Sequence, residues 1–461
     1  MKRTTAYFVG IKGVGMTALA QLLKANCYNV VGSDVAETFF TDEVLKKLKI
    51  KVFEGFDEKN IIKNPSDIYI ASSAYNEKNN PEIAYLEKNN IKIFSYAEML
   101  GRVFNDNHYG IVITGTHGKT TTTALVGSVL REARVDPTVV VGSRVRAWGT
   151  NAISGKSRYW VIEGDEYQNK LSYFNPKVIV LTHLEYDHPD FFPDFASYKN
   201  TFRDFVKRIP RDGYLIAFGD NKDVRDVAKA TRAKKIFYGY GARNDIRLLP
   251  SFQDESSQTF KIILKNKKNT LLTTQLVGDH NALNSVAAYA LAKTLRVSNA
   301  NIKKGILKFG GTSRRFEIVK KKNPIIIDDY AHHPTEVQAT LAAARKKFPD
   351  KKIIAVFHPH TFSRTEALLD DFAKSFNDAD HVIILEVYGS AREKKGEVGS
   401  KDLIRKMKVH SPIPVEYARD LDDAFMCAKK VLEKNNLKDC VVITIGAGDV
   451  WKVAKRLSEA L

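Results

Sequence analysis

The chain has 461 residues, of which 44% are hydrophobic and 10% aromatic, and its formal net charge is +19. This length exceeds a single hydrophobic core, and the composition is that of a folded globular protein, so we exclude a disordered chain and expect several domains. The excess of positive charge raises two function classes, nucleic-acid binding and binding to an anionic membrane surface.

The basic residues are dispersed along the chain. The 72 Lys and Arg residues are mixed with 53 Asp and Glu residues, and no long basic block or nucleic-acid-binding motif is present. No run approaches 18 apolar residues, which predicts no transmembrane helix. The cysteines Cys27, Cys427 and Cys440 form no CxxC pair and fit a reducing compartment. We expect a cytoplasmic monomer or homodimer that binds no nucleic acid and does not insert into a membrane.

The first elements in chain order have the pattern of an α/β unit. Apolar runs lie at 6–11, 28–34, 68–73 and 91–95. They alternate with helical periodicity, as at 16–26, which predicts a parallel sheet covered by helices. A polar, glycine-bearing segment at 101–110 follows, and we place the first domain at residues 1–105.

A second α/β unit begins with a strand at 111–114, a glycine-bearing loop and a helix at 122–133. Further strands are expected at 159–165, 178–184 and 214–220. Alternating residues rich in Thr and Gln between 246 and 277 predict antiparallel hairpins, and 281–295 predicts a helix. We place this central domain at residues 106–318 and its nucleotide site at the loop.

A third α/β unit follows at residues 319–461. Strands are expected at 324–330, 352–358, 381–388, 414–418 and 440–446. Helical periodicity at 335–348 and 366–376 separates the first three of these strands. The fold class is therefore α/β in all three expected domains.

The loop from Gly115 to Thr120 reads GTHGKT and lies between a strand and a helix. It offers backbone N–H groups, a helix N-terminus and Lys119 to a polyphosphate, and the hydroxyl of Thr120 to Mg²⁺. The strict phosphate-loop pattern requires glycine at 113, where this chain has Ile113, so only a shorter form is present. The context nevertheless predicts nucleotide binding.

Polar residues follow two neighbouring strands of the central unit. Glu163 ends one strand, and Asp187 and His188 come just after the next. Ligands of open α/β sheets gather at the carboxyl ends of the strands, so these side chains are expected to meet the phosphate loop in one crevice. Carboxylates are the ligands that hold a metal ion against nucleotide phosphates.

Several motifs, in this order, resemble those of the Mur ligases of bacterial cell-wall synthesis. They are TGTHGKTTTT at 114–123, E-x-DE at 163–166, DH at 187–188, GDHNALNSVAA at 278–288, GTSRRFE at 311–317 and DDYAHHPTE at 328–336. The resemblance covers essentially the whole chain. It is strongest, through segments such as GTNA at 149–152 and FHPHTFSRT at 357–365, to members that join L-alanine to UDP-N-acetylmuramate.

This resemblance implies the three-domain architecture of that family. A Rossmann-like N-terminal domain would bind the UDP-sugar, a central ATPase domain with parallel sheet and hairpins would bind ATP and Mg²⁺, and a Rossmann-like C-terminal domain would bind the amino acid. The acceptor carboxylate would attack the γ-phosphate to give an acyl phosphate and ADP. The amine of L-alanine would then displace phosphate.

The resemblance also implies site residues. Catalytic roles fall to Lys119, Glu163, His188, Arg315 and Asp329. ATP would contact Gly115, Thr116, His117, Gly118, Lys119, Thr120, Thr121, Asn281, Asn284, Arg315 and Asp329. The UDP-sugar would contact Gly10, Gly13, Gly15, Asp34, Ser72 and Ser73, and the amino acid would contact Tyr330, His332, His360 and Arg364. Mg²⁺ would be held by Thr120, Glu163 and His188, and His332 and His360 are candidate bases for the amine.

Besides Ile113, three positions depart from the expected patterns. Lys12 stands where a dinucleotide-type GxGxxG loop requires glycine. Tyr167 stands where alanine-adding members usually have serine, and His183 stands where asparagine is expected. The segments around Tyr167 and His183 are similar to the murein peptide ligase, which attaches a recycled peptide to the same sugar, so that peptide remains an alternative amine.

Three other function classes remain open at this stage. A dinucleotide oxidoreductase explains the first unit but gives the phosphate loop no role. A motor or switch NTPase uses the loop but hydrolyses ATP without an acceptor. A basic binding protein would show salt-sensitive binding to nucleic acid and no enzymatic activity.

Overall fold

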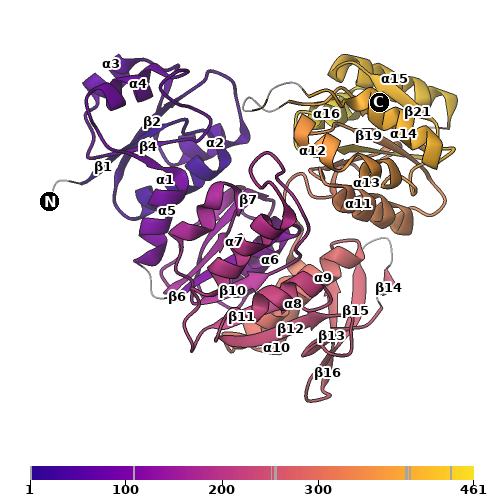
Figure 1. Cartoon of the computed structure of the whole chain (residues 1–461), viewed down its shortest axis with the longest axis horizontal. Coiled ribbons are helices and arrows are strands. Elements are labelled where there is room, and N and C mark those ends of the chain that lie inside the picture. The colour runs from indigo at the N-terminus through magenta and orange to yellow at the C-terminus, as the bar shows by residue number, and fades with distance from the viewer. Residues whose placement is uncertain are drawn as a thin grey trace.

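A computed structural model describes residues 3–106, 109–250, 252–253, 257–389, 393, 396–436 and 439–461. The described chain forms three sheets, each with its own helices. Figure 1 shows them as three bodies, which we call the N-terminal unit (indigo and purple), the central unit (magenta to salmon) and the C-terminal unit (orange to yellow). The mixed α/β class expected from the sequence is confirmed.

The N-terminal unit is a five-stranded parallel sheet in the order β3-β2-β1-β4-β5. Its elements are β1 (Thr5–Val9), α1 (Val14–Ala25), β2 (Asn29–Asp34), α2 (Phe40–Lys47), β3 (Lys51–Glu54), α3 (Glu58–Lys63), β4 (Ile68–Ala71), α4 (Pro81–Lys88), β5 (Ile93–Ser95) and α5 (Tyr96–Asn105). The strand order reverses between β1 and β4, which is where ligands bind in open α/β sheets.

The central unit carries an 11-stranded sheet. Its first part comprises β6 (Tyr109–Thr114), α6 (Lys119–Glu132), β7 (Thr138–Val145), β8 (Thr150–Ile153), β9 (Tyr159–Glu163), the 3-10 segment η1 (Tyr167–Tyr173), β10 (Val178–Leu181), α7 (Phe195–Val206), β11 (Tyr214–Phe218) and α8 (Lys222–Ala228). Its second part comprises β12 (Lys234–Gly239), β13 (Ile246–Leu248), β14 (Phe252–Gln253), β15 (Gln258–Leu264), β16 (Asn269–Thr274), α9 (Asp279–Thr294) and α10 (Asn299–Lys308).

The neighbouring strands β13, β12, β11, β10, β6, β9 and β7 of this sheet run parallel. Strands β14, β15 and β16 pair antiparallel at one edge, as the Thr- and Gln-rich sequence predicts. Strand β6 lies between β9 and β10 in the middle of the sheet. The phosphate loop that follows β6 therefore opens at the centre of the carboxyl edge.

The C-terminal unit has a six-stranded sheet in the order β17-β18-β22-β19-β20-β21. Its elements are β17 (Glu317–Lys320), β18 (Ile325–Asp329), α11 (Pro334–Lys347), β19 (Lys352–Phe357), α12 (Phe362–Ala367), α13 (Leu369–Lys374), β20 (His381–Leu385), α14 (Ser400–His410), β21 (Val415–Ala418), α15 (Leu421–Lys434), β22 (Cys440–Ile445) and α16 (Trp451–Ala460). Edge strand β17 is antiparallel to β18. The domain boundary expected between residues 318 and 319 falls inside β17.

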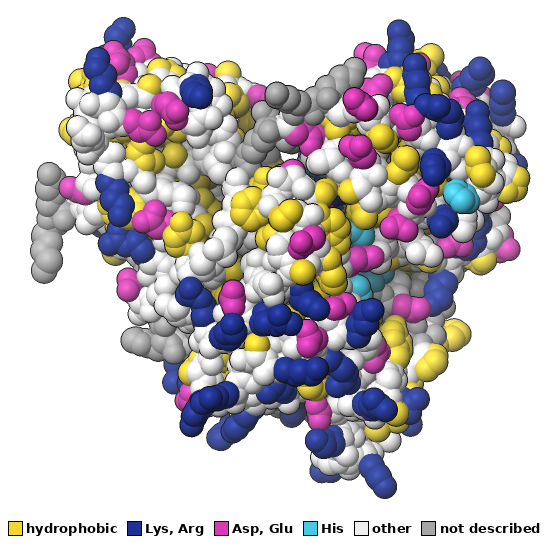
Figure 2. All heavy atoms as spheres, viewed as in Figure 1, with side chains coloured by type: hydrophobic (Ala, Val, Ile, Leu, Met, Phe, Trp, Pro, Cys, Tyr) yellow, Lys and Arg dark blue, Asp and Glu magenta, His cyan; other side chains and the backbone are white. Residues whose placement is uncertain are grey.

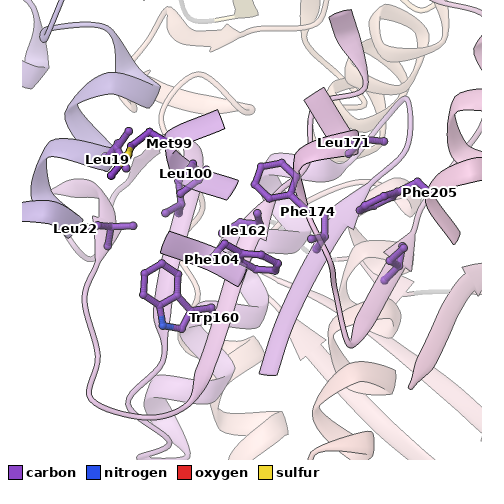
Figure 3. Close-up of a cluster of buried hydrophobic side chains, with 14 of the residues drawn as sticks. Leu19, Leu22, Met99, Leu100, Phe104, Trp160, Ile162, Leu171, Phe174 and Phe205 are labelled. Atoms are coloured by element: carbon purple, nitrogen blue, oxygen red, sulfur yellow. The ribbon is translucent and has the colours of Figure 1, made fainter. Parts of the chain in front are cut away.

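One apolar cluster joins the N-terminal and central units. It combines side chains of α1 and α5 with side chains of β9, η1 and α7 (Figure 3). Phe104 of α5 packs edge-on against Phe174, with 5.5 Å between ring centroids. Gly101 of α5 approaches the backbone of η1 so closely that a Cβ there would lie 2.6 Å from the oxygen of Tyr173.

The apolar clusters of the C-terminal sheet, in contrast, do not extend into the described part of the central unit. Among the described residues these clusters contain no side chain before Phe316, and the second apolar cluster of the central unit ends at Phe309. Within the same described part of the chain, no helix has the length and hydropathy needed to cross a membrane.

Candidate active site

The phosphate loop is built between β6 and α6. Gly118 caps the helix with φ of 80°, and Gly115 has φ of 124°, conformations that side chains rarely adopt. A Cβ at Gly115 would also lie 2.3 Å from Oγ1 of Thr182, and one at Gly118 would lie 2.5 Å from Oδ1 of Asn284. The loop therefore holds its backbone N–H groups at the start of α6, where they favour an anion.

Lys119 lies folded against this loop. Its ammonium donates to the carbonyl of Gly115 (2.6 Å) and to Glu166 Oε2 (3.1 Å). Glu166 has no exposed side-chain surface, and its other carboxylate oxygen accepts from the hydroxyl of Tyr198 at 2.9 Å. Burial lowers the pKa of Lys119, but the carboxylates of Glu166 and Asp165 outweigh burial and raise the pKa, so Lys119 is an ammonium.

Hard ligands gather beside the loop. Thr120 Oγ1 donates to Glu163 Oε1 at 2.7 Å, and Glu163 Oε2 accepts from the backbone of Gly142 at 2.6 Å. Asp165, Glu166 and His188 form a second group, in which one ligand atom from each lies within 4.8 Å of the others. Hydroxyl and carboxylate oxygens beside a phosphate loop are the ligands that nucleotide-bound Mg²⁺ prefers, so the oxygens of Thr120, Glu163, Asp165 and Glu166 fit that ion.

A cavity extends from the phosphate loop into the seam between the central and C-terminal units. It is lined by His117, Gly118, Thr120, Thr121, Thr182, His183, Phe218, Tyr238, His280, Asn281, Leu283, Asn284, Arg315, Phe316, Asp329, Thr335, Glu336, Ala339 and Thr340. The lining combines aromatic side chains with residues of the phosphate loop, which suits a purine nucleotide with its phosphates. The structure thus brings Asn281, Asn284, Arg315 and Asp329 to the loop.

Side chains from α9 brace this cavity. Thr122 Oγ1 of α6 donates to Asn284 Oδ1 (3.1 Å), and Asn284 Nδ2 donates to Asn281 Oδ1 (3.1 Å). Arg315 also lines the cavity, and its guanidinium lies 5.1 Å from the ring centroid of Tyr330. Burial raises the pKa of Asp329 to about 6, against the lowering effect of Arg315.

His117 of the phosphate loop contacts a carboxylate on each side. Its Nε2 lies 3.0 Å from Glu185 of the central unit, and its Nδ1 lies 3.1 Å from Glu336 of α11. Both ring nitrogens can donate only if the ring is protonated. Although burial lowers the pKa of His117, the two glutamates raise it to about 9. Thr335 adds a hydroxyl donor to Glu185 at 2.8 Å.

A buried ion pair crosses the same seam. Arg364 Nε donates to Asp187 Oδ1 at 2.8 Å, and both side chains are almost fully buried. Burial favours the neutral acid, but Arg364 holds the pKa of Asp187 well below its usual range. Arg364 also donates to the carbonyl of His360 at 3.2 Å, and the His332 and His360 rings are 6.4 Å apart. The ring of Tyr330 lies 5.5 Å from that of His332, so the four side chains expected to bind the amino acid lie together. Figure 2 shows histidine side chains in the hollow between the central and C-terminal units.

The side chains expected to hold the UDP-sugar lie at the carboxyl edge of the first sheet. Gly10 follows β1 with φ of 81°, and a Cβ there would lie 2.7 Å from the ring of Tyr75. Asp34 ends β2 and accepts from the backbone N–H of Lys12 at 2.6 Å, and Ser72 and Ser73 follow β4. A Cβ at Gly15 would lie 2.9 Å from Cζ of Tyr96, whereas one at Gly13 meets nothing closer than 3.5 Å.

The side chain of Lys12 is hydrogen-bonded to the segment that follows β2. Its ammonium donates to the carbonyls of Val35 (2.8 Å) and Glu37 (3.0 Å) and forms an ion pair with Asp42 at 3.0 Å. The lysine that replaces the expected glycine thus fastens the glycine loop to the segment after β2.

Several residues at the site escaped the sequence reasoning. Glu166, Glu185 and Glu336 contact the phosphate loop, and His280 and Phe218 line the cavity. A signal existed for Glu166, because E-x-DE places it beside Glu163, and for Glu336, which ends DDYAHHPTE. No local signal distinguishes Glu185 from any other carboxylate near a strand end.

Three family models match the chain. They are described as "Mur ligase family, catalytic domain" at residues 5–108, "Mur ligase middle domain" at 113–292 and "Mur ligase, glutamate ligase domain" at 314–448. Together they span all three units.

Similar proteins match over their full length. A UDP-N-acetylmuramate–L-alanine ligase of Desulfitobacterium hafniense (strain Y51) is 38% identical over 98% of both chains, and one of Clostridium acetobutylicum is 37% identical over 97% of this chain and 96% of the relative. The crystal structure of a UDP-N-acetylmuramate-alanine ligase from Thermotoga maritima superimposes with a TM-score of 0.82, at 26% identity over 99% of each chain. A murein peptide ligase from Psychrobacter arcticus has the same fold, with a TM-score of 0.73 at 23% identity over 99% and 98%.

Proposed function

The chain belongs to the Mur ligase family, and we propose that it is the ATP-dependent ligase that joins L-alanine to UDP-N-acetylmuramate in the cytoplasm, during synthesis of peptidoglycan precursors. The observation that carries this proposal is the full-length identity to relatives named for that reaction. The geometry agrees with it, because the phosphate loop opens toward a crevice that contains side chains of two units.

The first step forms a bond between the acceptor and phosphate. The lactyl carboxylate of UDP-N-acetylmuramate attacks the γ-phosphorus of ATP, the bond from phosphorus to the β,γ-bridging oxygen breaks, and ADP leaves. Negative oxygens crowd together in this step, so a fixed positive charge favours the transition state. Lys119 supplies that charge. Its ammonium donates to the carbonyl of Gly115 and to Glu166, and it can exchange these partners for the phosphates of a bound nucleotide.

Magnesium would be held at two places. Thr120 and Glu163 would bind one ion, and His188, with Asp165 and Glu166 beside it, would bind the second. Such ions would neutralise part of the phosphate charge. The protein's own part is to hold the ligands at the loop before the nucleotide arrives.

The second step needs a neutral amine. L-alanine attacks the acyl carbon, a tetrahedral intermediate forms, and phosphate leaves with the oxygen that came from the carboxylate. Burial lowers the pKa of His332 to about 3, so its ring is neutral at pH 7 but is a weak base there. Its Nδ1 faces the carbonyl of Tyr330 at 3.1 Å and must donate there, which leaves a lone pair on Nε2 for an amine proton.

His360 is less suited to that task. Arg364 Nη1 faces His360 Nδ1 at 3.4 Å, and because a guanidinium only donates, the ring lone pair is directed at Arg364. We therefore assign the base to His332, and we assign Arg364 to the carboxylate of the amino acid. Closure of the C-terminal unit over the crevice would keep water from the acyl phosphate.

Phosphate release tests the proposal. UDP-N-acetylmuramate, ATP and Mg²⁺ are supplied with L-alanine, glycine, L-serine or the L-Ala-D-Glu-containing tripeptide. We expect fast release with L-alanine and little release when either the acceptor or the amine is omitted. Turnover with the tripeptide and with none of the three amino acids would identify a peptide ligase, the enzyme whose sequence the segments around Tyr167 and His183 resemble. Release without any acceptor would identify a switch or motor NTPase.

Lys119→Ala sharpens this assay. We expect turnover to fall at least about 100-fold, because a preorganised charge is lost from the transition state. Lys156→Ala removes an exposed lysine of the same unit and should leave turnover unchanged. An active, folded Lys119→Ala enzyme would refute the role given to Lys119.

A further inference from the structure

His188 has an unusual backbone conformation for the ligand role given to it. Its φ is 56°, in the left-handed region, and its backbone N–H donates to Asp187 Oδ1 at 2.8 Å. Its carbonyl accepts from the N–H groups of Phe191 (3.0 Å) and Phe192 (2.9 Å), which closes a tight turn. Left-handed residues persist where the surrounding structure holds them, and they concentrate at functional sites.

The ring of Tyr167 lies against this turn. Its centroid is 4.7 Å from that of the His188 ring, at an interplanar angle of 36°, and 5.5 Å from that of Phe191. Its hydroxyl donates to Asp190 Oδ2 at 2.7 Å. One side chain therefore contacts three of the four residues from His188 to Phe191, and its hydroxyl fixes where the ring sits.

Tyr167 is tied to the opposite side of the cluster as well. Its backbone N–H donates to Asp165 Oδ1 at 3.1 Å, and Asp165 in turn accepts from Lys170 Nζ at 2.5 Å. The third member, Glu166, is held by Tyr198, as described above. Asp165 and His188 come from separate strand ends, and Tyr167 contacts both.

We propose that Tyr167 is a positioning residue, which holds the imidazole of His188 toward Asp165 and Glu166 and thereby sets the affinity of this cluster for a divalent cation. The inference rests on the second cation site of the proposed function. His188 Nε2 lies 3.9 Å from Glu166 Oε1, a separation that one small cation can bridge if the ring keeps its place. Without the tyrosine ring, the imidazole is free to rotate about its side-chain bonds and to lose that alignment.

Binding of Mn²⁺ to the full-length enzyme with ADP tests the proposal without relying on turnover. The free ion is followed by its electron paramagnetic resonance signal, and His188→Asn marks the site to which the imidazole belongs. We expect Tyr167→Leu to weaken that site about 10-fold, as loss of a supporting residue around a metal ligand does. Tyr167→Phe keeps the ring and loses one hydrogen bond, and we expect a loss of about 3-fold.

Two matched pairs keep the test specific. Asp190→Ala removes the acceptor of the tyrosine hydroxyl and should match Tyr167→Phe, whereas Asp190→Asn keeps an acceptor oxygen and should bind Mn²⁺ like the parent. Tyr173→Phe makes the same chemical change on a half-exposed tyrosine of η1 and should have no effect. In turnover, we expect the Tyr167→Leu defect to appear in the Mg²⁺ concentration needed for half-maximal rate and to be rescued by excess Mg²⁺.

Equal Mn²⁺ affinity in Tyr167→Leu and the parent enzyme would overturn the proposal. If Tyr167→Leu does not fold, Asp190→Ala decides instead, since Asp190 is exposed and parent-like binding there would also contradict it. If the parent enzyme binds Mn²⁺ through His188 but has no ligase activity, the proposed function is wrong, and the positioning role of Tyr167 is unaffected.

Discussion

The central unit meets its two neighbours through junctions of opposite chemistry. Toward the N-terminal unit the contact is a continuous apolar cluster that includes Leu19, Phe104 and Trp160 (Figure 3). Toward the C-terminal unit the main side-chain contacts are polar: His117 to Glu336, Asp187 to Arg364, and Asp279 to Lys346 at 2.9 Å. The nucleotide cavity lies at the polar junction.

From this difference we expect the N-terminal unit to stay fixed on the central unit and the C-terminal unit to be able to move. Separating the apolar junction exposes hydrophobic surface to water, at a cost proportional to the apolar area exposed. Separating the polar junction exchanges hydrogen bonds and ion pairs for contacts with water, which costs far less per contact. A nucleotide that binds at the phosphate loop therefore competes with the polar contacts between the central and C-terminal units, and these contacts can form again.

Breaking the apolar junction should have the largest effect. Phe104 is 1% exposed, packs on Phe174, and its ring lies where a Cβ of Gly110 would be. Phe104→Ala should lower the free energy of unfolding by about 3–5 kcal/mol, because it removes a large buried side chain and leaves a cavity. Urea unfolding followed by tryptophan fluorescence measures the loss, since Trp160 lies in the same cluster.

Phe252→Ala is the control for that experiment. Phe252 is 73% exposed, and its removal should change stability by less than about 0.5 kcal/mol. A Phe104→Ala protein as stable as this control would show that the apolar junction does not hold the two units together.

Breaking the polar junction should move a unit without unfolding it. Glu336→Gln removes one of the two carboxylates that charge-pair with His117. We expect the closed population without nucleotide to fall about 10-fold, the equivalent of one charge-assisted hydrogen bond, while the melting temperature changes little. Small-angle scattering should report a larger radius of gyration, and Glu459→Gln on the exposed face of α16 should not change it.

A Glu336→Gln protein that unfolds as readily as Phe104→Ala would contradict the distinction between the junctions. Identical scattering from Glu336→Gln and the parent would show that His117 does not hold the C-terminal unit.

The same junction should also respond to pH. Although burial lowers the pKa of His117, Glu185 and Glu336 raise it from 6.5 to about 9, so the stabilising contribution of His117 to this junction is complete below pH 6.5 and is lost as the pH rises through 9. Burial opposes ionisation of Glu185, but hydrogen bonding from His117 and the nearby His333 lower its pKa from 4.5 to about 2, so its contribution is lost only as the pH falls through 2. We expect gradual opening from pH 7 to 10.

Scattering at a series of pH values measures this opening. The groups that face His117 are Glu185, Glu336, His183 and His333, and their titration is covered by the control His117→Asn, which keeps the loop but cannot titrate. An opening step that survives in His117→Asn would belong to another group.

Much of the fold was predictable because its signals are local. Apolar runs and helical periodicity located most strands of all three sheets, and the motifs predicted the family, which the family models confirm. Strands β3, β7, β8, β12 and β17 were not identified, and neither were several helices, such as α7, α14 and α15. Charged residues interrupt the apolar pattern of β3 (KVFE) and β12 (KKIFYG), whereas β7 (TVVVGSRV) has an apolar run that was not recognised as a strand. The apolar cluster between units was also missed, since periodicity does not say which faces meet.

The site also contains contacts that local sequence signals predict and contacts that they do not. Parallel strands end at one edge, so the meeting of Glu163 with Thr120 at 2.7 Å could be anticipated from strand ends alone. The contacts of Glu185 with His117 and Thr335 depend on how two units are placed, which no local pattern encodes. The catalytic and binding roles given to these residues remain predictions.

The central claim is that the γ-phosphate activates a carboxylate, and an isotope measurement tests it most directly. UDP-N-acetylmuramate labelled with ¹⁸O in its lactyl carboxylate is turned over with ATP, Mg²⁺ and L-alanine, and the released phosphate is analysed by mass spectrometry. The acyl phosphate route requires one labelled oxygen in each phosphate, because the carbon–oxygen bond breaks when the amine displaces phosphate. Unlabelled phosphate that takes its oxygen from water would contradict the claim.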